Sequence, residues 1–264
     1  MIDIKRRFAD TPEGQVHYRV AGAGDPLILM HWAPGCGRQH ERVLPLFAQR
    51  GYTALAPDLM GYGDSDKPDR QWSIADFAAN LGHFMDALSL ESAFLYGGHA
   101  TAAVATEFAI TATGRVRRLV LDGSPIYDAK ERAENAGTYA KPLQLSKDGE
   151  HMLWAWRRSF RQPTMPLEEV FAATLDLLKA GFTWHTGYEA VFGYDMASRL
   201  PLLRVPVLAM TSTDDPLYEA NKVVMAQAPQ VVEHVTENRS ALAPGERAQQ
   251  FVAVIDEFLR SSAS

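Results

Sequence analysis

The chain has 264 residues, which suits one large domain or one domain that carries an insertion. Hydrophobic residues make up 47% and charged residues 22%, as expected of a globular protein with a sizeable core. The formal net charge is −6 and no basic stripe is visible, so we expect no nucleic-acid partner. No stretch has the roughly 18 consecutive apolar residues of a membrane span, and the N-terminus has no apolar signal region. We therefore expect no membrane partner and a cytoplasmic location.

Strand-like and helix-like segments alternate through the first half of the chain. The predicted strands are 15–22, 26–32, 52–59, 93–97 and 115–125. The predicted helices are 38–51, 73–90 with Ser73 as its N-cap, and an Ala-rich segment that follows residue 99. Strands that alternate with helices predict a mostly parallel sheet covered on both faces.

Residues 126–203 differ in character, since they are rich in Trp, Arg, Glu and Met. Helices are predicted here at 149–160, 166–182 and 184–200. The alternation then resumes with a strand from 205, a helix from about 218, a strand at 230–236 and a closing helix at 246–261. We therefore predict an α/β core from 1–125 and 204–264, with 126–203 inserted as a helical lid. The lid would cover the carboxyl ends of the strands, where open α/β sheets bind ligands.

The stretch "FLYGGHATAAVATEFA" at 94–109 ends a predicted strand, turns at two glycines and opens an Ala-rich helix. A strand-turn-helix of this kind usually presents a nucleophile at the tip of the turn. The residue at the tip is His99. The sequence therefore places an imidazole where a nucleophile is expected.

Three more stretches complete a family pattern: "HWAPGCG" at 31–37, "PDLMGYGDSDKP" at 57–68 and "ERAQQFVAVIDEFL" at 246–259. With the turn at His99, and in this order and spacing, the chain resembles the α/β-hydrolase superfamily. The resemblance is to its lidded branch of esterases, epoxide hydrolases and C–C hydrolases. It implies an α/β-hydrolase fold, with a mostly parallel eight-stranded sheet, helices on both faces and a helical lid.

The resemblance also implies a set of site residues. The backbone N–H groups of Ala33 and Ala100 align with the two donors of the family's oxyanion hole. Asp215, in "STDDP", aligns with the catalytic acid. Asp214 is a neighbouring alternative, and Asp122 stands at a second acid position that parts of the family use.

Aromatic residues and histidines near the expected pocket have less certain roles. Trp32 replaces a family glycine and either narrows the pocket, stacks on a ligand or packs. His31 is expected to hold its loop. In the insertion, Trp154, Trp184 and His185 are candidates to face the pocket, although most residues there are expected to pack between helices.

The positions that depart from the family pattern are those of the family's catalytic residues. His99 holds the serine position, Thr101 the second glycine position of the turn, and Ala241 aligns with the family's catalytic histidine. The ordinary triad needs a hydroxyl, an imidazole that takes its proton and a carboxylate that orients the imidazole. We therefore reject a standard acyl-serine mechanism and expect ordinary ester hydrolysis to be absent or very low.

Two interpretations of His99 follow. In the first, it is a general base or a nucleophile that acts on a small carbonyl compound, aromatic or polyketide-like, in lyase, isomerase, cyclase or atypical hydrolase chemistry. In the second, it is a relic, and the protein binds a ligand without turnover.

The remaining signals predict little further chemistry. The single cysteine, Cys36, is interpreted as a core or loop residue, with a reactive thiol as the alternative. We find neither a clustered metal-ligand pattern nor a Gly-rich phosphate loop, so we predict no cofactor and no metal. The predicted partner is a small-molecule ligand or substrate, and the sequence leaves a homodimer open.

Overall fold

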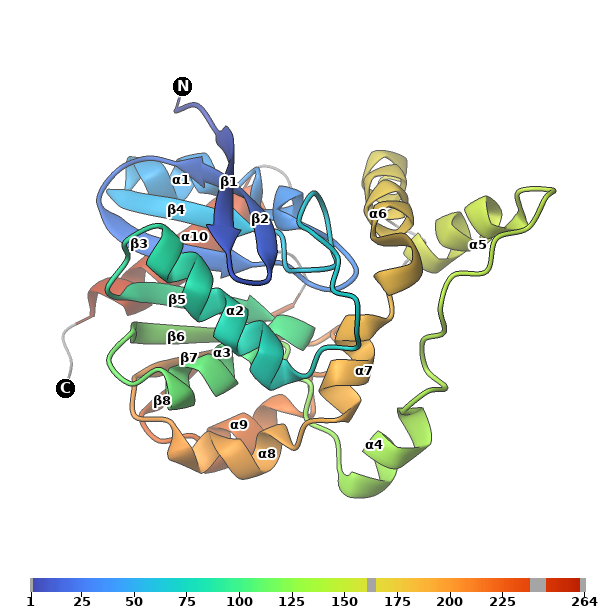
Figure 1. Cartoon of the computed structure of the whole chain (residues 1–264). Coiled ribbons are helices and arrows are strands. Elements are labelled where there is room, and N and C mark those ends of the chain that lie inside the picture. Colours follow the sequence, from blue (N-terminus) through green and yellow to red (C-terminus); the bar gives the residue numbers. More distant parts are fainter. Residues whose placement is uncertain (1, 161–164, 238–245, 262–264) are drawn as a thin grey trace.

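The computed structural model describes residues 2–160, 165–237 and 246–261. Its centre is an eight-stranded sheet in the order β1-β2-β4-β3-β5-β6-β7-β8 (Figure 1). The strands are β1 (Lys5–Thr11), β2 (Gly14–Ala21), β3 (Asp25–Met30), β4 (Tyr52–Pro57), β5 (Ala93–Gly98), β6 (Val116–Asp122), β7 (Val207–Ser212) and β8 (Val231–Thr236). β2 runs antiparallel to both β1 and β4, and every other pair is parallel. The predicted sheet is confirmed.

Helices cover both faces of this sheet. One face carries α1 (Leu44–Gln49) and α10 (Glu246–Arg260), and the other carries α2 (Ile74–Ala87), α3 (Ala100–Thr111) and α9 (Asn221–Gln227). Successive side chains of a strand point to opposite faces, so β3 contributes side chains to the hydrophobic cores on both faces of the sheet. Leu27 and Leu29 pack on the α1 and α10 side, whereas Ile28 and Met30 pack on the α2 and α3 side. A strand buried on both faces needs the unbroken apolar run that the sequence shows.

Local sequence explains where two of the helices begin. Ser73 caps α2 as predicted: its hydroxyl accepts the N–H of Asp76, whose carboxylate accepts the N–H of Ser73. The helix predicted at 38–51 is wrong in its first half. A 3-10 turn at Gly37–His40 comes first, and α1 begins only at Leu44, with Pro45 in its first turn. Proline is favourable at a helix start and unfavourable inside, so it sets this boundary.

Between β6 and β7 the chain forms a helical insertion, which stands at one end of the sheet (Figure 1). Its helices are α4 (Ala129–Asn135), α5 (Glu150–Ser159), α6 (Leu167–Ala180), α7 (Thr186–Phe192) and α8 (Met196–Arg199), with 3-10 turns at Gly181–Thr183 and Leu200–Leu202. The single helix predicted at 184–200 is two helices, because Asp195 caps a new one by accepting the N–H of Ser198. In the described residues, no helix is long and apolar enough to cross a bilayer.

A buried carboxylate on α6 fixes the insertion to the core. Asp176 accepts two hydrogen bonds from Arg38, the shorter at 2.7 Å, and one from the thiol of Cys36 at 3.4 Å. Burial, followed by the neighbouring Asp176 carboxylate, raises the pKa of the Cys36 thiol. The thiol is therefore protonated and donates, which agrees with a structural Cys36 and not with a reactive one.

We expect Asp176→Ala to lower the free energy of unfolding by about 1–3 kcal/mol, because Arg38 and Cys36 lose a shared buried acceptor. Urea denaturation measures this difference. The matched control is Glu169→Gln on the same helix, which removes a half-exposed contact with Arg42 at 3.0 Å and should cost less than about 1 kcal/mol. Equal losses in the two variants would contradict a special role for Asp176.

Candidate active site

His99 occupies the tip of a sharp turn between β5 and α3. Its backbone has φ +51° and ψ −122°, a strained conformation for a residue with a side chain. Its N–H donates to the carbonyl of Asp122 at 2.9 Å, and the Thr101 hydroxyl accepts the N–H of Gly98 at 2.9 Å. Gly97 allows close packing, since a Cβ there would lie 2.4 Å from the Thr101 carbonyl oxygen. The turn is the strand-to-helix elbow that the sequence predicts.

The imidazole of His99 reaches the acid directly. His99 Nε2 lies 2.9 Å from Asp215 Oδ2, and Asp215 Oδ1 accepts the N–H of Leu217 at 2.7 Å. Side-chain exposure is 21% for His99 and 3% for Asp215, so little water competes with this contact. Gly123 gives the ring room, since a Cβ there would lie 3.0 Å from His99 Nε2. The histidine at the nucleophile position thus bonds to the acid without an intervening group.

An ionised Asp215 would favour one tautomer of the imidazole. An ionised carboxylate only accepts hydrogen bonds, so Nε2 carries the proton that faces Asp215. In a neutral ring the lone pair is then on Nδ1. Among the described residues, Nδ1 has no hydrogen-bond partner.

The other two candidate acids face elsewhere. Asp214 accepts the hydroxyl of Ser212 at 2.7 Å, and Asp122 accepts the hydroxyl of Tyr96 at 2.8 Å. Asp215 is therefore the carboxylate that contacts His99. Ala241, which aligns with the family's histidine position, lies outside the described residues.

Trp32 packs against the catalytic candidate. Its indole stacks on the His99 ring with centroids 4.7 Å apart and planes 30° apart. The indole N–H donates to the Tyr96 hydroxyl at 3.4 Å, which connects Trp32 to Asp122. Of the roles considered from the sequence, the structure therefore shows packing on His99.

Two backbone N–H groups beside the elbow are available as hydrogen-bond donors. Ala33 follows Trp32 in the loop after β3, and Ala100 is the first residue of α3. In the described part of the chain, neither N–H has an acceptor. The helix dipole adds positive potential at Ala100. The loop is fixed on its far side by the Tyr188 hydroxyl, which donates to the Ala33 carbonyl at 3.0 Å.

Asp58 holds the loop that carries Ala33. It is fully buried and accepts from His17 Nδ1 at 2.9 Å and from the N–H groups of Gly37 and Asp64 at 2.7 and 2.8 Å. Burial alone would raise the pKa of Asp58, but these hydrogen bonds outweigh it and leave the pKa lowered. Beside it, His31 Nε2 accepts the N–H of Leu59 at 2.9 Å, the loop-holding role expected for that histidine.

A cavity of about 880 Å³ lies between the elbow, the Ala33 loop and the insertion. His99, Ala33, Ala100, Asp214 and Asp215 line it from the core side. The insertion contributes mostly aromatic and cationic side chains: Tyr127, Tyr139, Trp154, Arg157, Arg158, Phe160, Tyr188 and Phe192. This volume suits a drug-sized molecule.

Two of the three insertion residues named as candidates to face the pocket do not line this cavity. Trp154 does, but Trp184 is only 2% exposed and donates its indole N–H to the Lys141 carbonyl at 2.8 Å. Trp184 packs edge-on behind Trp154, with centroids 5.2 Å apart. His185, the N-cap of α7, is also absent from the lining. Helical periodicity predicts that such residues pack but not which face meets the cavity.

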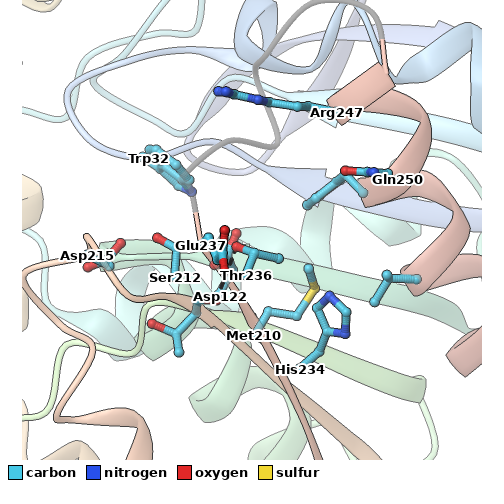
Figure 2. A pocket seen from close by; sticks show the side chains of 13 residues that line it. Trp32, Asp122, Met210, Ser212, Asp215, His234, Thr236, Glu237, Arg247 and Gln250 are labelled. Atoms are coloured by element: carbon cyan, nitrogen blue, oxygen red, sulfur yellow. Dashed lines mark hydrogen bonds between the residues drawn. The ribbon is translucent and has the colours of Figure 1, made fainter. Parts of the chain in front are cut away.

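A second hollow of about 440 Å³ borders the other side of the site (Figure 2). Figure 2 shows Trp32, Asp215 and Ser212 near one another, with Arg247 and Gln250 extending from α10. Asp215 lines both spaces, whereas Trp32 lines only this one. His99 therefore meets Asp215 at the boundary between the two hollows.

The sequence interpretation missed several residues that shape the site. Gly98 is one, since a Cβ there would lie 1.8 Å from Trp32 Nε1. Tyr96, Gly123 and Tyr188 are the others. The sequence did carry a signal for Gly98, namely the Gly-Gly pair before His99 together with Trp32 at a family glycine position. A bulky side chain at one position needs space at another.

Comparison with known proteins agrees with this architecture. The family model described as alpha/beta hydrolase fold matches residues 25–239. The chain belongs to the α/β-hydrolase fold family. A haloalkane dehalogenase of Mycobacterium marinum is 29% identical over 222 residues, which cover 81% of this chain and 67% of that protein. A soluble epoxide hydrolase of Corynebacterium sp. is 33% identical over 112 residues, which cover 42% of this chain but only 39% of that protein.

Solved structures share the fold over almost the full chain. A hydrolase from Pseudomonas aeruginosa PA01 has a TM-score of 0.80 at 20% identity, covering 97% of this chain and 99% of its own. A bromoperoxidase from Bacillus anthracis has a TM-score of 0.79 at 16% identity, covering 97% and 100%. At such identities the likeness establishes the α/β-hydrolase fold, and the chemistry must be argued from the site itself.

Proposed function

We propose that this α/β-hydrolase-fold protein is a cofactor-free enzyme in which His99 is the general base for a small carbonyl compound. The observation that carries the proposal is the 2.9 Å contact between His99 Nε2 and Asp215. It holds the proton on Nε2 and leaves the lone pair on Nδ1, in a residue that lines the large cavity. Asp215 is the orienting acid.

The backbone N–H groups of Ala33 and Ala100 indicate which reaction His99 would catalyse. A substrate carbonyl oxygen would accept from Ala33 and Ala100. His99 Nδ1 would take a proton from the carbon beside that carbonyl, and the electron pair of the broken C–H bond would move onto the oxygen. The resulting enolate is stabilised by the two N–H groups, and the imidazolium by Asp215. Return of the proton to another atom completes an isomerisation, and loss of a leaving group or attack on a second carbon gives a lyase or cyclase.

A nucleophilic role for His99 is the second candidate. Nδ1 would attack an acyl carbon, the leaving group would depart with the electron pair of the broken acyl bond, and water would hydrolyse the acyl-imidazole to the free acid and His99. Among the described residues that line the cavity, His99 is the only histidine, so no second imidazole there activates that water. This favours the general base, which needs one imidazole for both proton transfers.

The cavity lining supports an aromatic substrate under a lid formed by residues 126–203. Six of the lining side chains from the insertion are aromatic and offer flat apolar surface. Arg157 and Arg158 make no ion pair in the described part of the chain, and Arg158 lies over the Tyr139 ring at 5.6 Å. A stacked guanidinium keeps its N–H edges available for a carboxylate. We therefore include an acidic group in the proposed substrate class.

Deuterium exchange on simple carbonyl compounds tests this proposal. A panel of aromatic ketones, with and without a carboxylate, is incubated with the protein in deuterated water, and exchange beside the carbonyl is followed by NMR. We expect exchange with the wild type, loss of it with His99→Gln, and no labelling of the wild type by a fluorophosphonate probe. Stoichiometric labelling of a serine would contradict the proposal. Tight ligand binding without exchange or turnover would instead support a binding protein.

A further inference from the structure

We infer that Trp32 is a positioning residue that stabilises the protonated form of His99 through the face of its indole. The inference rests on the proposed function, since a base needs its conjugate acid stabilised during the reaction. It concerns a property of the imidazole that can be measured without any substrate.

The stacking geometry supports this role. The rings of Trp32 and His99 lie 4.7 Å apart and within 30° of parallel. The face of an indole is electron-rich and attracts a cation, and tryptophan is the strongest of the aromatic side chains in this respect. Trp32 is only 8% exposed, so water screens the attraction little. Protonation of His99 therefore strengthens a contact that already exists.

A hydrogen-bond chain fixes the indole in this orientation. Trp32 Nε1 donates to the Tyr96 hydroxyl at 3.4 Å, and that hydroxyl donates to Asp122 at 2.8 Å. Burial, followed by the charge of Asp122, raises the pKa of Tyr96 well above its usual value, so the phenol stays protonated. Tyr96 thus accepts from Trp32 and donates to Asp122 at any physiological pH.

The backbone at Gly98 leaves room for the Trp32 indole. A Cβ at residue 98 would lie 1.8 Å from Trp32 Nε1 and 2.3 Å from its Cδ1. No side chain other than hydrogen fits there while Trp32 stacks on His99. Residues 32 and 98 therefore form a matched pair, because the indole keeps its place on the His99 ring only while residue 98 is glycine.

Besides the indole, several charged groups influence the protonation of the His99 ring. Asp215 contacts Nε2, Asp122 lies behind Tyr96, and Asp214 lines the same cavity, as do Arg157 and Arg158. All of them are retained when only residue 32 is changed. A difference between variants at this position therefore reports the contribution of the indole.

The test is an NMR titration of the His99 ring in Trp32→Leu. Loss of the electron-rich face should move the titration midpoint to lower pH by about 0.5 to 1 unit, because the imidazolium loses its cation–π partner. If Trp32 only filled space, its removal would admit water, which solvates the imidazolium and moves the midpoint to higher pH. An unchanged or higher midpoint would therefore overturn the inference.

Two further measurements keep the test interpretable. Trp32→Phe conserves a ring with a weaker field and should shift the midpoint in the same direction by a smaller amount, which serves if the leucine variant does not fold. His83, paired with Glu13 at 2.8 Å between α2 and the β1–β2 turn, is the internal control and should titrate identically in every variant. If the shift occurs but deuterium exchange does not, the stacking inference holds and the proposed reaction fails.

Discussion

Replacing His99 by glutamine should lower the rate of carbonyl-linked proton transfer by about 10²–10⁴, the usual contribution of a positioned general base. Glutamine conserves a polar side chain of similar reach but cannot accept and return a proton. Ligand binding should change little, because the two N–H donors and the aromatic lining remain. Deuterium exchange rates and ligand affinity, measured on the same variant, separate these effects.

Substitutions of Asp215 and Asp214 should lower the deuterium exchange rate by different amounts in the same assay. Asp215→Asn should reduce the exchange rate less than His99→Gln does, because Asp215 orients the ring and stabilises its protonated form without meeting the substrate carbon. Asp214→Asn should cost less still, since Asp214 accepts from Ser212 and does not contact His99. A larger loss from Asp214→Asn than from Asp215→Asn would contradict the assignment of the acid.

Replacing Asp58 by alanine should lower the free energy of unfolding by about 3–5 kcal/mol, the range expected when one partner of a buried charged pair is removed. The substitution removes the carboxylate that accepts from His17, from Arg19 and from the N–H groups of Gly37 and Asp64, and the Gly37 N–H is buried. Because Gly37 belongs to the loop that carries Ala33, exchange activity should fall as well. Urea or thermal denaturation measures the stability loss.

Asp25→Ala is the matched control, because Asp25 forms an exposed pair with Arg117 at 2.9 Å and should contribute less than about 1 kcal/mol. The pH dependence gives a second check. The pKa of Asp58 is lowered on folding, so its stabilisation is fully present above the ordinary value of about 3.9 and is lost as the pH falls below it. The difference between wild type and Asp58→Ala should therefore shrink only below about pH 4, and a constant difference down to pH 2 would contradict this explanation.

The strands of the sheet could be predicted because burial on both faces leaves a plain signal in the sequence. After Asp25, β3 is apolar from Pro26 to Met30, and all four residues from Leu27 to Met30 are fully buried. Two elements escaped prediction for the opposite reason. β1 reads KRRFADT and is mostly exposed at the sheet edge, and α4 has no buried residue, so neither shows an apolar period.

The elbow could also be predicted, because its dipeptide of glycines and its Ala-rich helix are local features. The contact between His99 and Asp215 could not, since the residues lie 116 positions apart and the acid of an ordinary triad contacts the catalytic histidine, not the residue at the nucleophile position. Whether an imidazole spans that gap depends on Gly123, whose missing Cβ admits the ring. The space that Gly123 leaves depends on the folded structure, and the spacing of motifs along the sequence does not predict it.

The role of His99 as a base is tested most directly by the ¹⁵N NMR spectrum of its ring in the neutral form. Base catalysis by His99 requires Asp215 to hold the proton on Nε2, so that the lone pair of Nδ1 is available to a substrate. We predict a protonated Nε2 and a bare Nδ1 in the wild type, with this preference weakened in Asp215→Asn. A neutral wild-type ring that carries its proton on Nδ1 would contradict the proposal that His99 is a base oriented by Asp215.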